Sequence, residues 1–278
     1  MNRFDKICKD IKEVKIQGAR NVAMAAAKAL LIKHDKKAVR KLINLRPTEP
    51  TLRNTIKFIL AKPTIKEGVG FVLEHFKESQ KKISKYGSRF IKNGMTIYTH
   101  CHSSTVINIF LEAKRQGKKF EVYCTETRPL YQGRITASQL SKARIPVTMF
   151  VDSAARIALK KADISFYGTD AITPTKIYNK IGSELFAIIA KKYDVPLYVA
   201  TDSWKFDPET IYGIEEKIEK RSIKEVWSNP PKGVKISNMA FEKIDPALVT
   251  AIISELGVFM KKSFISEVRR VYPFMFKK

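Results

Sequence analysis

Several features that define other protein classes are scarce in this chain of 278 residues. It has three cysteines, Cys8, Cys101 and Cys124, and no CxxC pair, so we expect no disulfide framework and favour a reducing compartment. No apolar run approaches the roughly 20 residues that a membrane helix needs. The first residues alternate acidic and basic side chains without an apolar segment, so no secretory signal is expected. Together these absences predict a cytoplasmic protein that does not associate with membranes.

Acidic residues are also few, because 27 Asp and Glu stand against 52 Lys and Arg, for a formal net charge of +25. The basic surplus is denser in residues 1–85 than in the rest of the chain. Such a surplus attracts anionic partners, which include nucleic acid, phosphorylated metabolites and acidic proteins. A lysine-rich, solvated surface explains the same charge without any partner. The charge alone therefore identifies none.

The pattern of apolar residues divides the chain into two parts. Residues 19–33, 51–61 and 69–84 show the apolar spacing of helices, with prolines between them. After Gly87, short β-rich runs alternate with helix-length stretches. The five runs read MTIYTHC, FEVYCT, PVTMFV, DISFYG and PLYVAT. Strands separated by crossover helices predict a parallel, doubly wound sheet.

We therefore predict an α/β protein with a helical domain at residues 1–85 and a Rossmann-like parallel-sheet domain, for catalysis or ligand binding, at residues 86–278. Helices are expected after Pro246, returning to the sheet or to a partner. Within them, residues 249–260 (VTAIISELGVFM) carry an apolar face that suits either the core or a dimer interface.

Polar clusters follow all five predicted strands: HCHSS, TETRP, DS, GTD and TDSWKF. Ligands of such sheets bind outside the carboxyl ends of the strands, where these loops meet. We therefore expect a single crevice that holds Cys101 together with Glu126, Arg128, Asp152 and Asp170.

Cys101 lies between two histidines, and its residue type allows several interpretations. A zinc site made of His100, Cys101 and His102 is disfavoured, because neighbouring residues at a strand end point in opposite directions. A Cys–His nucleophile would need His34 or His75, both in the helical part. A buried structural cysteine remains open. In the remaining interpretation the start of a helix lowers the pKa of the thiol, and a carboxylate at another strand end shares the proton transfer.

Six segments carry a family resemblance: THCHSSTV, VYCTETRPLYQGRITASQL, IPVTMFVDSAAR, YGTDAI, NKIGS and SWKFDP. They resemble the family that unites ribose-1,5-bisphosphate isomerases, methylthioribose-1-phosphate isomerases and the regulatory subunits of translation initiation factor 2B. The resemblance is strong over residues 94–208 and weaker over the first third. The cysteine, the ETRP run and DSAAR are most similar to the archaeal ribose-1,5-bisphosphate isomerases.

The resemblance implies an isomerase that converts ribose 1,5-bisphosphate to ribulose 1,5-bisphosphate, works without cofactor or metal and forms a homo-oligomer, at least a dimer. The alternative is an archaeal regulatory protein related to initiation factor 2B. Such a protein would bind a sugar phosphate or nucleotide without turnover and meet a partner protein or RNA.

The resemblance also implies roles for single residues. Cys101 and Asp170 match the catalytic cysteine and aspartate of the family. Arg46 matches an arginine that closes over the ligand, and Lys205 matches a lysine on the phosphate side. The implied substrate-binding residues are Gly18, Ala19, Arg20, Arg46, Ser103, Ser104, Thr105, Arg128, Gln132, Asn179, Lys180 and Lys205.

Two segments depart from the family pattern. Residues 17–20 read QGAR where the isomerases carry Arg-Gly-Ala-Gly. The loop after Asp170 carries residues 174–176 (PTK) where Asn-Gly is usual, and it is one residue shorter. These departures favour the non-catalytic alternative, whereas the pair of Cys101 and Asp170 favours the enzyme.

Overall fold

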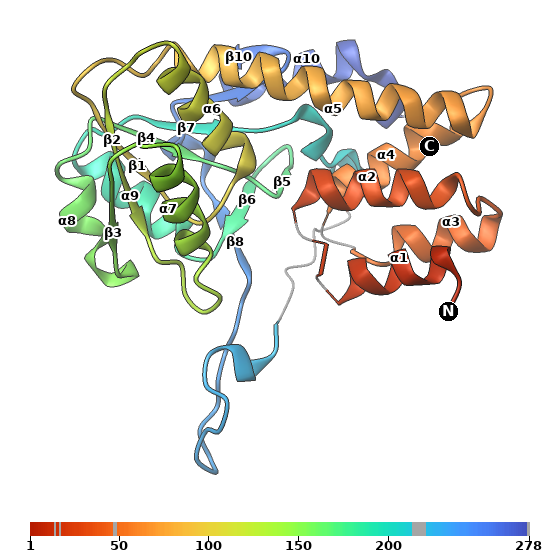
Figure 1. The fold of residues 1–278 in the computed structure, drawn as a ribbon, viewed down its shortest axis with the longest axis horizontal. Coiled ribbons are helices and arrows are strands. Elements are labelled where there is room, and N and C mark those ends of the chain that lie inside the picture. Colours follow the sequence, from red (N-terminus) through yellow and green to blue (C-terminus); the bar gives the residue numbers. More distant parts are fainter. Residues whose placement is uncertain (14, 17, 47–48, 213–220, 277–278) are drawn as a thin grey trace.

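The computed structural model describes residues 1–13, 15–16, 18–46, 49–212 and 221–276. Its first part is helical, as predicted, and lies beside an α/β part (Figure 1). The five helices are α1 (Arg3–Lys12), α2 (Ala19–Leu30), α3 (Lys36–Ile43), α4 (Pro50–Leu60) and α5 (Ile65–Ser88). Three of them begin after a side-chain cap, since Asn2, Asp35 and Thr64 each accept a hydrogen bond from an amide of the first turn.

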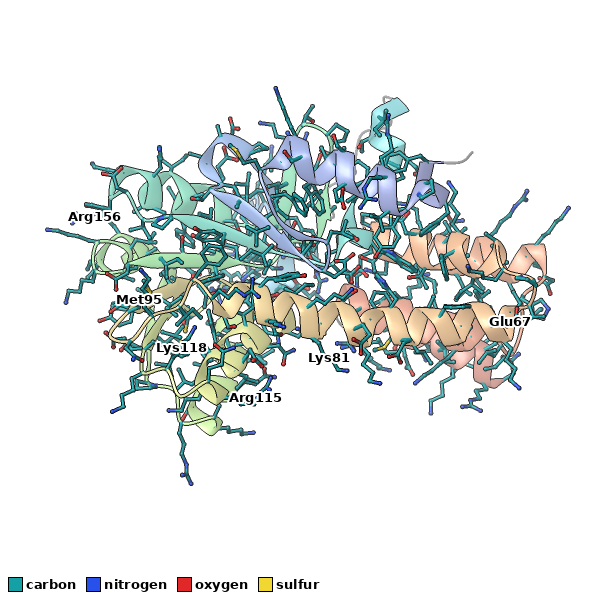
Figure 2. All side chains as sticks on the ribbon, turned by 90° about the horizontal axis from the view of Figure 1, so that it is seen from above. Glu67, Lys81, Met95, Arg115, Lys118 and Arg156 are labelled. Atoms are coloured by element: carbon teal, nitrogen blue, oxygen red, sulfur yellow. The ribbon has the colours of Figure 1, made fainter. Side chains whose placement is uncertain are left out.

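Helix α5 joins the two parts of the molecule. It is 24 residues long and runs from Glu67 in the helical part to the α/β part, past Lys81 (Figure 2). One hydrophobic cluster contains Leu30 and Val72 of the helical part together with Leu197 of the sheet. Because this core is continuous, the proposed domain division at residue 85 stays a prediction.

The α/β part contains a seven-stranded sheet in the order β10-β9-β7-β4-β1-β2-β3. These strands are β1 (Thr96–Thr99), β2 (Glu121–Thr125), β3 (Val147–Phe150), β4 (Ile164–Tyr167), β7 (Leu197–Ala200), β9 (Ala251–Ser254) and β10 (Gly257–Phe259). All neighbouring pairs are parallel except β9 with β10. The five predicted strands are β1, β2, β3, β4 and β7, so the predicted fold class is confirmed.

Helices cover both faces of this sheet. They are α6 (Ser104–Arg115), α7 (Gln132–Lys142), α8 (Ala155–Leu159), α9 (Ser183–Lys192) and α10 (Lys261–Val271). Successive strand residues alternate between the two cores: Ile97 packs with α6 and α7, whereas Tyr98 packs with α8 and α9. Six 3-10 turns complete the described elements: η1 (Asp152–Ala154), η2 (Ser203–Lys205), η3 (Pro208–Tyr212), η4 (Ile223–Glu225), η5 (Pro246–Leu248) and η6 (Pro273–Phe276).

The prediction of a helix within residues 249–260 is wrong. These residues form β9 and β10, a hairpin at the edge of the main sheet. Ile252 and Ile253 are both buried, in the cores on opposite faces of the sheet, which is the alternation of a strand with two covered faces. Gly257 follows the turn with a φ of 139°, which an L side chain rarely adopts.

A second, small sheet was not predicted. Its strands are β5 (Ala171–Ile172), β6 (Ile177–Lys180) and β8 (Phe241–Ile244), in the antiparallel order β5-β6-β8. The short loop between β5 and β6 is a tight turn, in which the Thr173 hydroxyl accepts from the amides of Thr175 and Lys176. Across the part of the chain that is described, no helix combines the length and hydrophobicity that crossing a membrane would require.

Candidate functional site

A cavity of about 380 Å³ lies between the helical part and the carboxyl ends of the sheet strands. It is lined by all but one of the residues that the family resemblance implies as catalytic or substrate-binding. These residues are Gly18, Ala19, Arg20, Arg46, Cys101, Ser103, Ser104, Thr105, Gln132, Asp170, Asn179, Lys180 and Lys205. The exception is Arg128. The individual roles of the lining residues stay predictions.

The convergence expected of all the strand-end clusters is only partly correct. Glu126 faces Arg134 instead, at 3.5 Å, and does not line the cavity. Asp152 accepts the amides of Thr127 and Arg128 at 2.9 and 2.7 Å and so shapes the loop after β2. Because of these contacts, the TETRP cluster forms a turn that stabilises the loop after β2 and does not line the cavity.

Arg128 is exposed and lies away from the cavity lining. Its guanidinium donates to the Tyr131 hydroxyl at 2.7 Å and to the carbonyl oxygen of Val226 at 3.1 Å. The side chain therefore joins the loop after β2 to the segment that follows residue 221. The cause is local: the amide of Arg128 is fixed on Asp152, and the side chain extends outward from there.

Cys101 follows β1 with a φ of 64°, in the left-handed region. Its amide donates to the Thr127 hydroxyl at 3.1 Å, and its carbonyl oxygen accepts from the Thr136 hydroxyl at 2.8 Å. Removal from water raises the pKa of the Cys101 thiol to about 11, against the lowering effect of Lys180. The prediction of a lowered pKa is therefore wrong, because desolvation outweighs the helix start and the nearby cation. In this state Cys101 holds a proton that it can donate.

The two histidines beside Cys101 have partners of their own. The ring nitrogens of His100 lie 2.7 Å from the Thr125 hydroxyl and 3.0 Å from the carbonyl oxygen of Ile181. Burial lowers the pKa of His100 to about 4. Nδ1 of His102 lies 3.1 Å from the Thr136 hydroxyl. These contacts give the two rings different partners. The alternation expected at the strand end does not hold for His102, which lines the cavity together with Cys101, because the left-handed backbone at Cys101 ends the extended strand.

Helix α6 begins at the cavity. Ser103 is its N-cap and accepts from the amide of Val106 at 3.4 Å, and Ser104 and Thr105 form the first turn. A Cβ at Gly168, just after β4, would lie 2.6 Å from the Ser103 hydroxyl. Glycine at this position therefore allows the ends of two strands and the helix start to approach. The amides of a first turn lack partners within the helix and suit an anion.

Helix α2 also begins at the cavity, from the opposite part of the molecule. Gly18 precedes it with a φ of 84°, and no side chain caps it. The neighbouring Nε of Arg20 is buried without a hydrogen-bond partner among the described residues, and so is Oε1 of Gln132. Buried polar atoms in this state suit a polar ligand. Gln17, the first residue of the altered QGAR segment, lies outside the described residues.

Arg46 is buried, and its guanidinium forms an ion pair with Glu49 at 2.9 Å. Glu49 also lines the cavity and was not predicted, since nothing in the RPTEP stretch distinguishes it from a surface acid. Asp202 and Arg221 are further lining residues that were not predicted. Asp202 belongs to the strand-end cluster TDSWKF, so its position was available from the sequence although its role was not.

The remaining polar groups come from β4, β6 and the end of β7. The amide of Asp170 donates to the carbonyl oxygen of Tyr178 at 2.9 Å, which ties the end of β4 to β6. Asn179 donates to the Ser183 hydroxyl at 2.9 Å. Asp170 and Lys180 both lie close enough to Cys101 to shift the pKa of its thiol, in opposite directions. Nζ of Lys205 donates to the carbonyl oxygen of Thr169.

One cavity thus brings together a protonated thiol, a carboxylate, two lysines and two helix starts. A thiol and a carboxylate can transfer protons to and from a bound substrate. Lysine side chains and first-turn amides can hold phosphate groups. Within the described residues, the chemistry of this lining suits an anionic substrate with exchangeable protons.

Comparison with known proteins identifies the family of the chain. The profile of the Initiation factor 2 subunit family matches residues 12–261. The ribose 1,5-bisphosphate isomerase of Methanocaldococcus jannaschii is 39% identical over 272 residues, which cover 89% of this chain and 88% of that protein. The isomerase of the same name from Thermococcus kodakarensis is 33% identical and covers 98% of this chain and 95% of its own.

Among solved structures, the translation initiation factor eIF-2B of Pyrococcus horikoshii has a TM-score of 0.82 at 25% identity, over 95% of this chain and 98% of its own. The 5-methylthioribose 1-phosphate isomerase of the same organism shares the fold, with a TM-score of 0.72 at 22% identity over 97% of this chain and 87% of its own. The resemblance drawn from the motifs is confirmed, and the chain belongs to the Initiation factor 2 subunit family.

Proposed function

We propose that this protein is an aldose–ketose isomerase that converts ribose 1,5-bisphosphate to ribulose 1,5-bisphosphate. The observation that carries the proposal is the shared cavity, in which Cys101 and Asp170 lie with two helix starts and two lysines. The curated relatives that are 33% to 39% identical over most of the chain bear the name of this isomerase. A bisphosphate has two anionic ends, which suits a cavity with anion-binding groups from both parts of the molecule.

The proposed proton transfers give each of the two groups one role. The Asp170 carboxylate takes the proton from C2 of the sugar, while the Cys101 thiol gives its proton to the ring oxygen as the bond from C1 to that oxygen breaks. The product is an enol with a double bond between C1 and C2. The Cys101 thiolate then takes the proton of the C2 hydroxyl, and Asp170 returns its proton to C1. Both residues end in their initial states, and the sugar is isomerised.

The raised pKa of Cys101 supports the role of proton donor in the first step. A thiol with a pKa of about 11 is protonated at neutral pH and can give its proton to an oxygen that becomes an alkoxide. Lys180, which favours the thiolate form of Cys101, would stabilise the charge that remains on sulfur.

The decisive experiment follows ribose 1,5-bisphosphate with the purified protein by phosphorus NMR. We expect the phosphate signals of ribulose 1,5-bisphosphate to replace those of the substrate. Methylthioribose 1-phosphate is the comparison substrate, and we expect it to remain unchanged, because it offers only one phosphate to the two helix starts. No conversion of the bisphosphate at high protein concentration would refute the proposed activity.

The second candidate is a regulatory protein that binds a sugar phosphate or nucleotide without turnover. The tight turn of residues 173–176 supports it, because the family resemblance implies a loop with Asn-Gly at this place in the isomerases. A rise in melting temperature with the logarithm of ribose 1,5-bisphosphate or nucleoside monophosphate concentration, without conversion, would favour this candidate. Its partner would be an initiation-factor protein or RNA that meets the basic surface.

We also propose that the protein forms a homo-oligomer, at least a dimer. Large apolar side chains are exposed on α8 and α9, where Ile157, Leu185 and Ile188 are each more than half exposed. Neighbouring exposed apolar side chains favour a protein contact. Light scattering at micromolar concentration should give at least twice the mass of one chain, and a monomer would contradict the proposal.

A further inference from the structure

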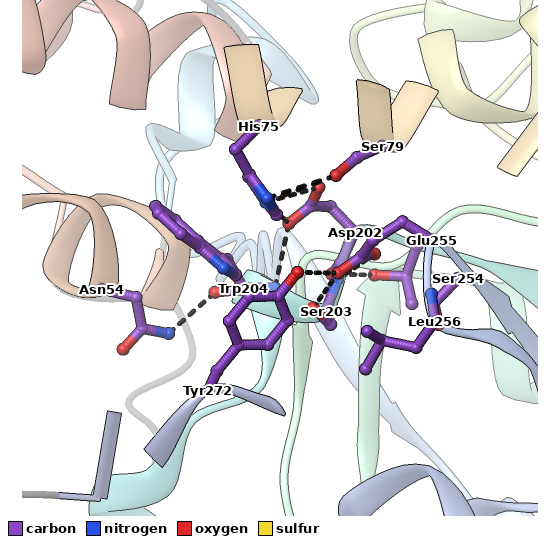
Figure 3. Close-up of polar contacts among 11 residues, drawn as sticks. Asn54, His75, Ser79, Asp202, Ser203, Trp204, Ser254, Glu255, Leu256 and Tyr272 are labelled. Carbon is purple, nitrogen blue, oxygen red and sulfur yellow. Dashed lines mark hydrogen bonds and ion pairs between the residues drawn. The ribbon is translucent and has the colours of Figure 1, made fainter. Parts of the chain in front are cut away.

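The segment that carries Lys205 is held by the helical part of the molecule. It comprises residues 202–206, which follow β7 and include the short turn η2. Figure 3 shows the side chains that surround the first residues of this segment. Lys205 lines the cavity, and its amine donates to the carbonyl oxygen of Thr169. The position of this amine therefore depends on what fixes the backbone on either side of it.

Asn54 fixes that backbone from α4. Its side-chain nitrogen Nδ2 donates to the carbonyl oxygen of Trp204 at 2.8 Å and to that of Phe206 at 2.9 Å. These are the two residues that flank Lys205 in the chain. Asn54 is buried, and about 150 residues separate it from the segment it holds. The side chain of Asn54 thus holds the backbone on both sides of Lys205.

Helix α5 holds the beginning of the same segment. Nε2 of His75 lies 3.2 Å from the Asp202 carboxylate, and the ring of His75 stacks on Trp204 with centroids 4.1 Å apart. The Asp202 carboxylate also accepts from the amide of Trp204 at 2.9 Å. Two helices therefore bind this segment: α5 contacts it at Asp202, and α4 contacts the residues on either side of Lys205.

The sheet edge and the C-terminal helix region hold the segment from the other side. Glu255 accepts from the amide of Ser203 at 3.0 Å and from the Ser203 hydroxyl, and Tyr272 donates to the same carboxylate at 3.2 Å. His75, Asp202 and Glu255 lie close enough together to suggest a metal site. Three of the four carboxylate oxygens already accept hydrogen bonds from these protein donors, and the fourth, Oδ2 of Asp202, lies 3.2 Å from Nε2 of His75. The arrangement therefore fits a hydrogen-bonded support.

We propose that Asn54 is a positioning residue that holds Lys205 in place for the phosphate of the substrate. The inference rests on the proposed function, which gives Lys205 a role in binding. It adds that this role depends on a residue of the helical part that does not line the cavity. Without the donor at Asn54, two buried carbonyl groups lose their partner, and the backbone around Lys205 shifts to recover hydrogen bonds.

The test is a double-mutant cycle with Asn54→Leu, Lys205→Met and the combination of both. We measure kcat and KM for ribose 1,5-bisphosphate, and the dissociation constant of the same compound by titration calorimetry. Asn54→Leu should raise KM by about tenfold and change kcat by less than about threefold, because it displaces a binding group and not a reacting one. In the Lys205→Met background, Asn54→Leu should change KM by less than about twofold.

Two further variants separate positioning from folding. Thr55→Val is the matched control, since Thr55 is buried in the same helix, its hydroxyl has no hydrogen-bond partner among the described residues, and the change keeps the shape. It should leave KM unchanged. Asn54→Ser keeps one donor, should fold even if Asn54→Leu does not, and should give a KM between those of the wild type and the leucine variant.

The outcomes distinguish this inference from the proposed function. Wild-type KM and dissociation constant in Asn54→Leu and Asn54→Ser, or equal effects of Asn54→Leu with and without Lys205, would overturn the positioning role alone. Binding without turnover by the wild type would refute the enzymatic proposal, and the same cycle would then be decided on dissociation constants. A wild type that neither converts nor binds ribose 1,5-bisphosphate would overturn both.

Discussion

The sheet and the helical part contribute to the cavity in different ways. The sheet supplies reacting groups from the ends of its strands, as with Cys101 after β1 and Asp170 after β4. The helical part supplies a helix start at Gly18, the buried Arg46 and the hold of Asn54 on the Lys205 segment. Groups at strand ends are fixed by the topology of the sheet. Those of the helical part act only while the two parts stay packed together.

The largest expected effect is a loss of turnover in variants of the two residues that follow strands of the sheet. Cys101→Ser and Asp170→Asn should each lower kcat by about a thousandfold or more, since each removes a group that transfers protons. The dissociation constant for ribose 1,5-bisphosphate should change by less than about threefold, because the phosphate-binding groups remain. Steady-state assays and calorimetry measure the two quantities.

Cys124→Ala is the control for these variants. Cys124 is a buried cysteine on β2 that does not line the cavity, so its loss should affect stability and leave kcat near the wild-type value. Turnover at the wild-type rate in Cys101→Ser or Asp170→Asn would contradict the assigned roles.

The next effect concerns the helical part. Arg46→Ala should weaken binding of ribose 1,5-bisphosphate by about ten- to a hundredfold, since a charged hydrogen bond contributes about 1.5–3 kcal/mol. The same change removes a cation from beside the buried Glu49 and should lower the melting temperature. Adding Glu49→Gln should restore the melting temperature without restoring binding. If binding returned as well, Arg46 would act on stability and not on the ligand.

A smaller effect tests the contact between the strand ends and α6. Gly168→Ala should cost about 1–3 kcal/mol of stability and weaken ligand binding, because the added Cβ would lie 2.6 Å from the Ser103 hydroxyl at the start of α6. Gly70→Ala is the matched control. A Cβ at this exposed helix position meets nothing within 4 Å, so the change should raise the free energy of unfolding by about 0.5–1 kcal/mol. Chemical unfolding measures both changes, and equal destabilisation in the two variants would refute the close-approach argument.

The smallest expected effect is a pH dependence of stability where the two parts meet. Burial and the nearby Asp202 raise the pKa of Glu255 to about 7. Burial lowers the pKa of His75, but the Asp202 and Glu255 carboxylates together raise it, so the net pKa lies above its usual value. Both groups hold their protons more tightly in the folded state. The stability that these two groups contribute to the folded state is therefore complete at low pH and is lost as the pH rises through their pKa values in the folded protein.

The melting temperature should accordingly fall as the pH rises from about 5 to 8. Asp202, whose pKa is lowered through its contacts with His75 despite burial, acts in the opposite direction only below its usual pKa of 3.8. Glu255→Gln removes a titrating carboxyl group and should therefore make the melting temperature less dependent on pH. The amide of the glutamine can still accept from the Ser203 amide and donate to the hydroxyl groups of Ser203 and Tyr272. Glu74→Gln, at an exposed position on α5, should leave the slope unchanged, and a flattened slope in that control would refute the assignment.

The parts of the fold that could be predicted are those set by local pattern and topology. The five strands with crossover helices placed Cys101 and Asp170 at one edge of the sheet, although their roles came only from the family resemblance. The hairpin of β9 and β10 was missed, because a short apolar run buried on both faces lacks a clear period. The small sheet was missed because its strands are short and β8 lies far along the chain from β5 and β6.

The contributions of the helical part were the least predictable. Nothing near Asn54 in the sequence indicates that its amide meets carbonyl groups about 150 residues away. Glu49 likewise looks like an ordinary acid until the fold buries it beside Arg46. The pKa of Cys101 was predicted in the wrong direction for a related reason, since desolvation depends on all the elements that enclose the thiol.

The raised pKa of Cys101 has a consequence for how long the protein survives in an oxidising or alkylating environment. At neutral pH, a thiol with a pKa of about 11 is almost entirely protonated. The thiolate is the nucleophile that attacks peroxide and alkylating reagents, so these reagents should modify Cys101 slowly even though it borders an open cavity. The same exclusion of water that leaves a proton available for transfer thus protects the sulfur from irreversible damage.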